Sequence, residues 1–216
     1  MKTARQKISL ILEVLIAVMV LVSWLRMVFS FGDNGTISSG GFSNLKYFTV
    51  LSNLLMGAAA ILNVIYTIKS IKQKTEIPLW VSRLVYAGAS AVMVTMLVVI
   101  LFLWPVFKIP GLYSGANLWF HLLIPLMSAA AFMLGEGRIS FRDSFFAIIP
   151  VLVYGAWYIG NNMINGIGEW PDTNDWYGFL SWGWIPGTII FLMLVLMNWG
   201  TALLMRAVRN KFNGAK

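Results

Sequence analysis

Residues Leu79–Trp104 read LWVSRLVYAGASAVMVTMLVVILFLW, a run of 26 residues in which Arg83 carries the only charge. An α-helix rises about 1.5 Å per residue, so roughly 20 apolar residues cross the hydrocarbon core of a bilayer. Because lipid offers no hydrogen-bond partners to the backbone, a run of this kind must be helical. The stretch therefore predicts a membrane-spanning helix.

The rest of the chain repeats this pattern, with short polar stretches rich in Gly and Pro between the apolar runs. Only 11% of the residues are charged, whereas a soluble domain carries about 25%. No segment shows the in/out alternation of a β-barrel strand. We predict one all-α membrane domain over residues 1–216, a bundle of six transmembrane helices. The other five spans are predicted near Ile8–Phe31, Phe48–Ile68, Leu118–Leu134, Phe145–Ile164 and Trp184–Met205.

The basic residues are distributed unevenly between the two sets of helix ends. Three of them, Arg26, Lys46 and Lys108, lie on one side. Basic residues stay in the cytoplasm, so the more basic side is predicted to be cytoplasmic, with both termini. The net charge of +8 then describes a surface near anionic lipid heads and not a nucleic-acid site. The thirteen residues of the basic side are Lys2, Arg5, Lys7, Lys69, Lys72, Lys74, Arg83, Arg138, Arg142, Arg206, Arg209, Lys211 and Lys216.

The composition also limits the chemistry that the chain can perform. It contains no cysteine and a single histidine, which excludes disulfides, thiolate metal sites and polyhistidine metal sites. We therefore expect no metal and no cofactor. The basic segment Met1–Lys7 and the apolar run after it resemble the start of a signal peptide. Because the run lacks a small-residue cleavage site, we interpret it as the first membrane span.

Polar side chains inside membrane spans are costly, so each is a candidate functional residue. Thr49 and His121 lie near the outer ends of the second and fourth spans. Asn53 follows Thr49 by four residues and Asn117 precedes His121 by four, so each pair shares a helix face. A hydroxyl beside an imidazole can act as a nucleophile with its general base. The alternative is that these groups only form hydrogen bonds between helices.

Further polar groups are expected at the same outer level. Asparagine amides can donate to a developing oxyanion, and an arginine can bind a carboxylate or phosphate head group. Six tryptophans at this boundary predict either an interfacial belt or a cap over an outward-facing site. The amides and the arginine are Asn161, Asn162, Asn165 and Arg26, and the tryptophans are Trp104, Trp119, Trp170, Trp176, Trp182 and Trp184.

Two more features bear on packing. Glu13 lies toward the inner side of the first span, where we expect a basic partner such as Lys7 or Arg83. The small-residue stretches Gly57–Ala60 and Ala87–Ser90 predict close approach of neighbouring helices.

Two short motifs resemble a known family. The segment LKYFTVLSN at residues 45–53 and the segment NLWFHLLIP at residues 117–125 are similar to the two motifs of the androgen-induced and androgen-dependent membrane hydrolases. The aromatic stretch DWYGFL at residues 175–180 resembles the loop before that family's last helix. Helix order and spacing agree as well, and the sequence looks closest to the six-helix bacterial members.

The resemblance implies a function as well as a fold. Members of the family are threonine hydrolases that cleave fatty acid esters of hydroxy fatty acids. On this basis Thr49 is expected to be the nucleophile and His121 its base, with membrane lipids or fatty acid esters as partners and a bacterial plasma membrane as the location. Asn53, Asn117, Asn161, Asn165 and Arg26 remain candidates for binding the oxyanion or the substrate. An acyltransferase would differ from the hydrolase only in passing the acyl group to an alcohol and not to water. The alternative function is a non-catalytic protein that binds or transports a lipid or small solute, and a third is a structural or assembly factor whose polar cluster serves helix packing.

Overall fold

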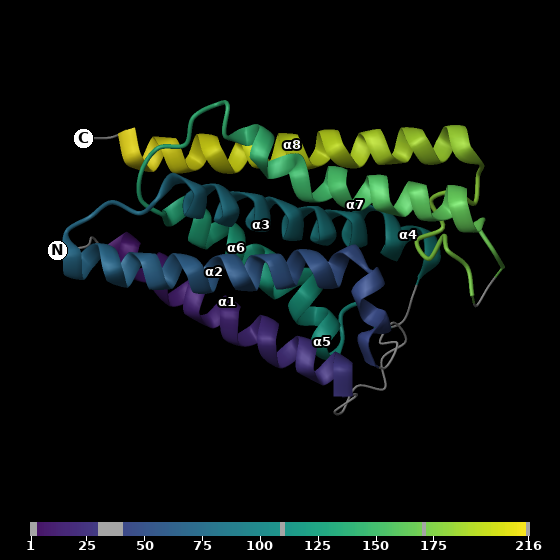
Figure 1. Ribbon diagram of the computed structural model, residues 1–216, viewed down its shortest axis with the longest axis horizontal. Coiled ribbons are helices and arrows are strands. Elements are labelled where there is room, and N and C mark those ends of the chain that lie inside the picture. Colours follow the sequence, from purple (N-terminus) through teal and green to yellow (C-terminus); the bar gives the residue numbers. More distant parts are fainter. Residues whose placement is uncertain (1–3, 30–40, 109–110, 170–171, 215–216) are drawn as a thin grey trace.

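The computed structural model describes residues 4–29, 41–108, 111–169 and 172–214, and these ranges contain helices and loops but no strand. Six spans in them are long and apolar enough to cross a membrane, which confirms the predicted all-helical bundle (Figure 1). Four of the spans are single helices: α1 (Ala4–Phe29), α2 (Phe48–Gln73), α7 (Ser144–Asn165) and α8 (Trp184–Gly214).

The third and fourth spans each contain a wider, π-helical turn. The third consists of α3 (Leu79–Val98), η2 (Val99–Leu103) and α4 (Trp104–Phe107). The fourth consists of α5 (Gly115–Leu118), η3 (Trp119–Leu123) and α6 (Ile124–Leu134). A short 3-10 helix, η1 (Gly41–Lys46), precedes α2.

Two prolines explain these π-helical turns. A proline has no N–H to donate, and its ring clashes with the carbonyl four residues earlier. For Pro105 that carbonyl belongs to Leu101, and for Pro125 it belongs to His121. Leu101 and His121 are the middle residues of η2 and η3, where the wider turn relieves the clash. Pro125 therefore sets the local backbone at His121.

The helix bounds agree closely with the predicted spans except at the two ends of the chain and at the end of α2, which continues to Gln73 and not only to Ile68. Helix α8 continues to Gly214, well past the predicted end at Met205. Its basic last turns extend the helix beyond the lipid, where hydropathy does not mark a helix. Helix α1 begins at Ala4 and not at Ile8. The predicted end Phe31, together with Lys2, Trp170 and Lys216, lies outside the described residues.

The outward face of the bundle is strongly apolar. Ile185 is 77% exposed and Val153 is 64% exposed. An apolar surface of this extent is unfavourable in water. This surface identifies the chain as a multi-pass membrane protein. The first turn of α1 and the last turn of α8 lie at the same end of the bundle (Figure 1), which we call the inner end. The opposite end, which holds η1 and α5, is the outer end.

Helix α3 lies at the centre of the bundle and contacts α2, α6, α7 and α8. Its small residues allow this: a Cβ atom at Gly88 would lie only 3.0 Å from the Met56 Cα atom of α2. In the same way, a Cβ atom at Gly57 would meet the Val20 side chain of α1 at 2.8 Å. The small-residue stretches thus mark close helix contacts, as the sequence predicts.

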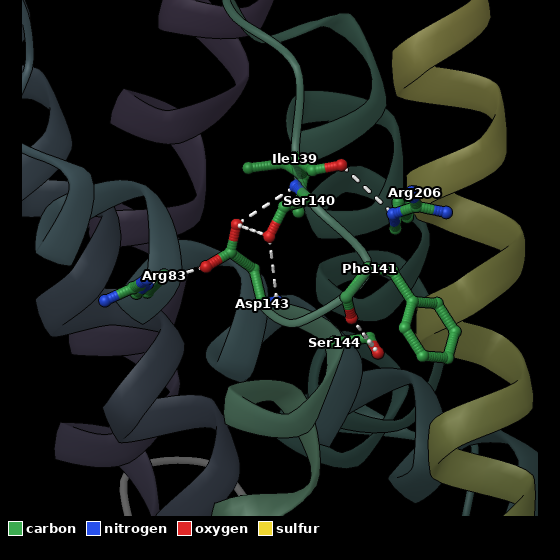
Figure 2. Close-up of polar contacts among 7 residues, drawn as sticks. All are labelled: Arg83, Ile139, Ser140, Phe141, Asp143, Ser144 and Arg206. Atoms are coloured by element: carbon green, nitrogen blue, oxygen red, sulfur yellow. Dashed lines mark hydrogen bonds and ion pairs between the residues drawn. The ribbon is translucent and has the colours of Figure 1, made fainter.

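The inner end is fixed by a polar network around the α6–α7 loop (Figure 2). Arg83 Nε of α3 lies 2.8 Å from Asp143 Oδ1. The Ser140 amide and hydroxyl donate to Asp143 Oδ2 at 3.0 and 2.7 Å. Arg83 thus pairs with Asp143, while Glu13, its expected partner, accepts hydrogen bonds from Asn63. The loop is joined to α8 as well, because Arg206 Nε donates to the Ile139 carbonyl.

Replacing Asp143 with asparagine is expected to destabilise the protein by about 1 kcal/mol at neutral pH. Burial alone would raise the pKa of Asp143, but the Ser140 hydroxyl and Arg83 together hold this pKa below its ordinary value. The resulting stability is present above the unfolded pKa and is lost as the pH falls through the lowered folded pKa. Thermal unfolding of the two proteins should therefore differ at pH 7 and converge at strongly acidic pH.

Asp172→Asn is the matched control, because Asp172 is exposed in an outer loop. Its melting temperature should equal that of the wild type at every pH. Equal melting temperatures for Asp143→Asn and wild type at pH 7 would contradict the assigned role of the network.

Candidate active site

Thr49, the second residue of α2, lines a narrow cavity of about 60 Å³. Residues of α3, α7, α8 and the loop 175–180 form the rest of its wall. Thr95, the other threonine there, has its hydroxyl 3.0 Å from Ser52 Oγ. The cavity therefore combines a few hydroxyl groups with an otherwise apolar wall. Its apolar lining includes Val94, Val98, Leu103, Val151, Phe191 and Leu194.

The Tyr177 phenol is the direct polar neighbour of Thr49. Its oxygen accepts the Phe48 N–H at 2.8 Å, and the Thr49 and Tyr154 side chains lie close enough to lower its pKa. Burial raises the pKa of Tyr177 to about 12 even though these neighbours oppose the rise. The phenol is thus neutral at physiological pH and can donate a proton in a hydrogen bond. The sequence marked this loop only as aromatic, so the position of Tyr177 beside Thr49 went unpredicted.

Side-chain contacts hold the loop 175–180 over the cavity. The Asp175 carboxylate accepts hydrogen bonds from the Tyr158 hydroxyl and from the Leu180 amide. Trp176 Nε1 donates to the Tyr154 hydroxyl at 3.1 Å. Of the two expectations for the outer tryptophans, Trp176 therefore fits the cap. Three others, Trp104, Trp182 and Trp184, are more than 40% exposed and fit the interfacial belt.

His121 is buried, with 3% of its surface exposed, at the middle of η3. Its Nδ1 lies 2.6 Å from the Leu112 carbonyl oxygen. Because a carbonyl can only accept, Nδ1 carries the proton, and Nε2 of the neutral ring then has the lone pair that a general base needs. The Leu112 carbonyl thus orients the imidazole. Every residue has a backbone carbonyl, so the sequence could not indicate which group orients His121.

Asn53 connects the backbones on which Thr49 and His121 lie. Its side-chain amide donates to the Thr49 carbonyl at 2.7 Å and to the Phe120 carbonyl at 3.3 Å. Within the described ranges, however, Thr49 and His121 form no direct hydrogen bond. The Thr49 side chain faces the cavity and Tyr177, and His121 is not among the residues that line this cavity. The structure therefore brings the two segments together and leaves the two side chains apart.

The other predicted residues lie away from the cavity at Thr49. Asn117 donates to the Gly111 carbonyl at 3.1 Å and so steadies the segment that carries Leu112. Asn161 donates to Asn174 Oδ1 at 3.1 Å, and Asn165 donates to Asn161 Oδ1 at 2.9 Å. Arg26 is half-buried near the outer end of α1. Among the residues that the structure describes, no group of three or more His, Asp or Glu could hold a metal ion.

A second apolar depression, a groove of about 610 Å³, lies between α2, α3 and α7. Phe48 and Tyr154 line both this groove and the cavity at Thr49, and their ring centroids are 5.0 Å apart. The groove also includes the strongly exposed Val153, so it faces the lipid. The Phe48–Tyr154 pair therefore separates Thr49 from the bilayer.

Gly155→Ala is expected to narrow the cavity and to lower the melting temperature, in keeping with a cost of about 1–3 kcal/mol for overpacking. Gly155 lines the cavity, and a Cβ atom there would lie 1.8 Å from Phe191 Cε2. Gly160→Ala is the control on the same helix, because a Cβ atom at Gly160 meets nothing within 4 Å. Thermal unfolding of both variants checks the packing. A stable Gly155→Ala protein with an unchanged melting temperature would contradict it.

Comparison of the chain with models of protein families, with curated proteins and with solved structures gave no match.

Proposed function

We propose that this protein is a membrane-embedded lipid ester hydrolase with Thr49 as its nucleophile and His121 as its general base. The observation that carries the proposal is the position of the Thr49 hydroxyl in a largely apolar cavity next to a lipid-facing groove. An acyl chain in the groove would bring its ester bond to the Phe48–Tyr154 pair. Opening of this pair would admit the ester to Thr49.

The reaction has two steps. Thr49 Oγ1 attacks the ester carbonyl, the bond to the alcohol breaks, and His121 Nε2 passes the hydroxyl proton to the departing alcohol. Water then attacks the acyl-threonine with His121 again as base, which releases the fatty acid and restores Thr49. The first step requires the Thr49 hydroxyl to turn from Tyr177 toward the imidazole. A helical threonine readily occupies two χ1 rotamers, which allows its hydroxyl to turn.

Tyr177 and Asn53 have supporting roles in this mechanism. Once the Thr49 hydroxyl has turned away, the neutral Tyr177 phenol can donate to the developing oxyanion. The Asn53 amide keeps the backbone at Thr49 close to the backbone at Phe120, so that the nucleophile and its base stay at the same depth. Leu112 holds the imidazole in the tautomer that the reaction requires.

The cavity and the family resemblance both support a lipid substrate class. The apolar groove suits an acyl chain that enters from the lipid, and the two sequence motifs suggest fatty acid esters of hydroxy fatty acids. The same resemblance supports a bacterial plasma membrane as its location. These assignments belong to the proposal.

A chain-length series tests the proposal. The purified protein in lipid nanodiscs would be given nitrophenyl esters with acyl chains from acetyl to palmitoyl, with Thr49→Val as the background. We expect hydrolysis above this background that increases with chain length. Hydrolysis of acetyl esters alone would contradict a lipid substrate. No hydrolysis of any ester would contradict the enzyme.

A second candidate function is the binding or transport of a lipid without chemistry. It is favoured by the separation of Thr49 and His121, which form no hydrogen bond with each other in the described part of the chain. In that case a fluorescent fatty acid should bind to the nanodisc-embedded protein and be displaced by esters that remain intact. Recovery of cleaved ester would contradict this candidate.

A further inference from the structure

The lipid-facing groove between α2, α3 and α7 extends from the Phe48–Tyr154 pair toward the inner end of the bundle. Its inner part is lined by Trp80 and Arg83 near the start of α3 and by Phe146 near the start of α7. From Phe146 to Tyr154 the axis of α7 rises about 12 Å. One leaflet contributes about 15 Å to the hydrocarbon core. The groove is therefore about as long as an acyl chain that starts at the inner surface and reaches the middle of the bilayer.

Arg83 is the only charged residue among the described residues that line this groove. Its guanidinium lies 4.3 Å from the centre of the Phe146 ring, and its side chain is 33% exposed. Its Nε donates to Asp143 Oδ1, while the other oxygen of Asp143 is bonded to Ser140.

The two terminal nitrogens of Arg83 are available to a ligand. Over the ranges that the structure describes, neither of them has a hydrogen-bond acceptor in the protein. Figure 2 shows a terminal nitrogen directed away from Asp143. The Phe146 ring and Asp143 thus hold the guanidinium in place at the end of an apolar groove, with N–H donors left over.

Aromatic side chains surround the inner mouth of the groove. Trp80 is 49% exposed, and its ring packs edge to face on Tyr66 of α2 with the centroids 5.4 Å apart. Lys69 Nζ lies 6.0 Å from the centre of the Tyr66 ring. Tryptophan and tyrosine rings beside basic side chains are typical of the head-group level of a bilayer. Arg83 therefore lies near the level at which lipid phosphates are found.

We propose that the groove binds a phospholipid of the leaflet at the inner end, with its phosphate on the Arg83 guanidinium. A guanidinium can donate two parallel hydrogen bonds to a phosphate. One acyl chain lies along the groove and ends near the Phe48–Tyr154 pair, while the second chain stays in the bilayer. The apolar wall and the single positive charge at its inner end match the two parts of such a lipid.

This binding does not rest on the proposed hydrolase function. The same groove is the path that the hydrolase proposal gives to the acyl chain of the ester. A bound phospholipid and a substrate would therefore compete for it.

The variants that test Arg83 share an Asp143→Asn background. Arg83→Gln alone would leave the buried Asp143 carboxylate without its ion-pair partner, whereas Asp143→Asn removes that carboxylate and keeps the guanidinium. Arg142→Gln in the same background is the matched control, because Arg142 is an exposed arginine of the α6–α7 loop that does not line the groove.

Native mass spectrometry of the detergent-purified protein, titrated with phosphatidylglycerol, measures the affinity. We expect one tightly held lipid on Asp143→Asn and on the Arg142→Gln double variant. The Arg83→Gln double variant should bind it about ten- to hundredfold more weakly, the loss expected for hydrogen bonds to a charged group. Equal affinities of the Arg83→Gln double variant and its Asp143→Asn parent would overturn the proposal, as would an equal loss in the Arg142→Gln double variant.

Two further lipids test the phosphate. Diacylglycerol with the same chains lacks the phosphate and should bind Asp143→Asn no better than phosphatidylglycerol binds the Arg83→Gln double variant. Palmitate, which has a carboxylate and one chain, should not displace phosphatidylglycerol at an equal concentration. Tight binding of diacylglycerol, or displacement by palmitate, would overturn the assignment of a phospholipid.

Photolabelling tests the direction of the bound lipid. A phosphatidylglycerol with a diazirine near the end of one acyl chain would be incorporated into nanodiscs with Asp143→Asn and irradiated. We expect adducts on Leu51 and Val153, which line the groove, several-fold above those on Leu192 and Leu196, which are exposed on α8. This excess should disappear in the Arg83→Gln double variant. Equal labelling of both surfaces in the Asp143→Asn protein would show only ordinary lipid around the bundle and would overturn the proposal.

Discussion

Replacing Thr49 with valine is expected to lower ester hydrolysis by about a thousandfold or more, the loss typical of removing a nucleophile. Valine matches the shape of threonine and removes only the hydroxyl. The cavity wall around Thr49 is largely apolar, and the Tyr177 oxygen keeps the Phe48 N–H as a hydrogen-bond partner, so a methyl group should fit there. The melting temperature should stay close to that of the wild type, and hydrolysis of a long-chain ester in nanodiscs measures the effect.

Two variants accompany this experiment. Thr49→Ser keeps a hydroxyl and should retain measurable turnover. Thr188→Val is the matched control, because Thr188 is exposed on α8 and its hydroxyl only donates to the Trp184 carbonyl. It should hydrolyse the ester at the wild-type rate. A Thr49→Val protein with wild-type turnover would show that Thr49 is not the nucleophile.

Replacing His121 with glutamine is expected to lower the same activity by about a hundred- to ten-thousandfold, the usual contribution of a general base. The glutamine amide can still donate to the Leu112 carbonyl, as His121 Nδ1 does, so the backbone of η3 should be preserved. Glutamine cannot accept the hydroxyl proton of Thr49. The loss should therefore appear in turnover and not in thermal stability.

Asn165→Ala serves as the control for His121→Gln. Asn165 is a predicted site residue that is exposed and bonded to Asn161 at the end of α7, so its replacement should leave hydrolysis unchanged. Full activity of His121→Gln would mean that another group takes the proton of Thr49. Loss of activity in Asn165→Ala would mean that the outer loop takes part in the site.

The six spans could be predicted because the signal for a membrane helix is local. Each run of apolar residues predicts a helix independently of the other helices that it packs against. The extension of α8 to Gly214 was missed for the same reason, since a helix outside the lipid has no need of apolar residues. The π-helical turns do have a sequence signal, namely Pro105 and Pro125. Each proline ring clashes with the carbonyl four residues earlier, and this clash indicates where the helix widens.

The candidate site could be predicted only in part. Thr49, Asn53 and His121 stand out because polar groups are rare inside apolar runs. The carbonyl that orients His121 belongs to the backbone of Leu112, and any residue type could supply it. Tyr177 lies beside Thr49 although its loop comes 128 positions later in the sequence. Such a contact depends on how helices and loops pack, which a single sequence does not encode locally.

The pairs at the inner end show the same limit. The sequence predicts a basic partner for Glu13, such as Lys7 or Arg83, because opposite charges attract, and the structure shows Arg83 paired elsewhere. In the structure, Arg83 pairs with Asp143, and Glu13 accepts hydrogen bonds from the Asn63 amide. The two partners are 60 positions apart in the first pair and 50 in the second. Which faces of α1, α2 and α3 meet is set by small residues such as Gly57 and Gly88, and this decides the pairing.

The nucleophile itself can be identified by covalent labelling. The nanodisc-embedded protein would be treated with a long-chain alkyl phosphonate, digested, and mapped by peptide mass spectrometry. We predict a single adduct on Thr49 that is absent from Thr49→Val and forms much more slowly in His121→Gln. An adduct on another hydroxyl of the site, such as Ser52 or Thr95, or no adduct in the wild-type protein, would contradict the assignment of Thr49 as the catalytic nucleophile.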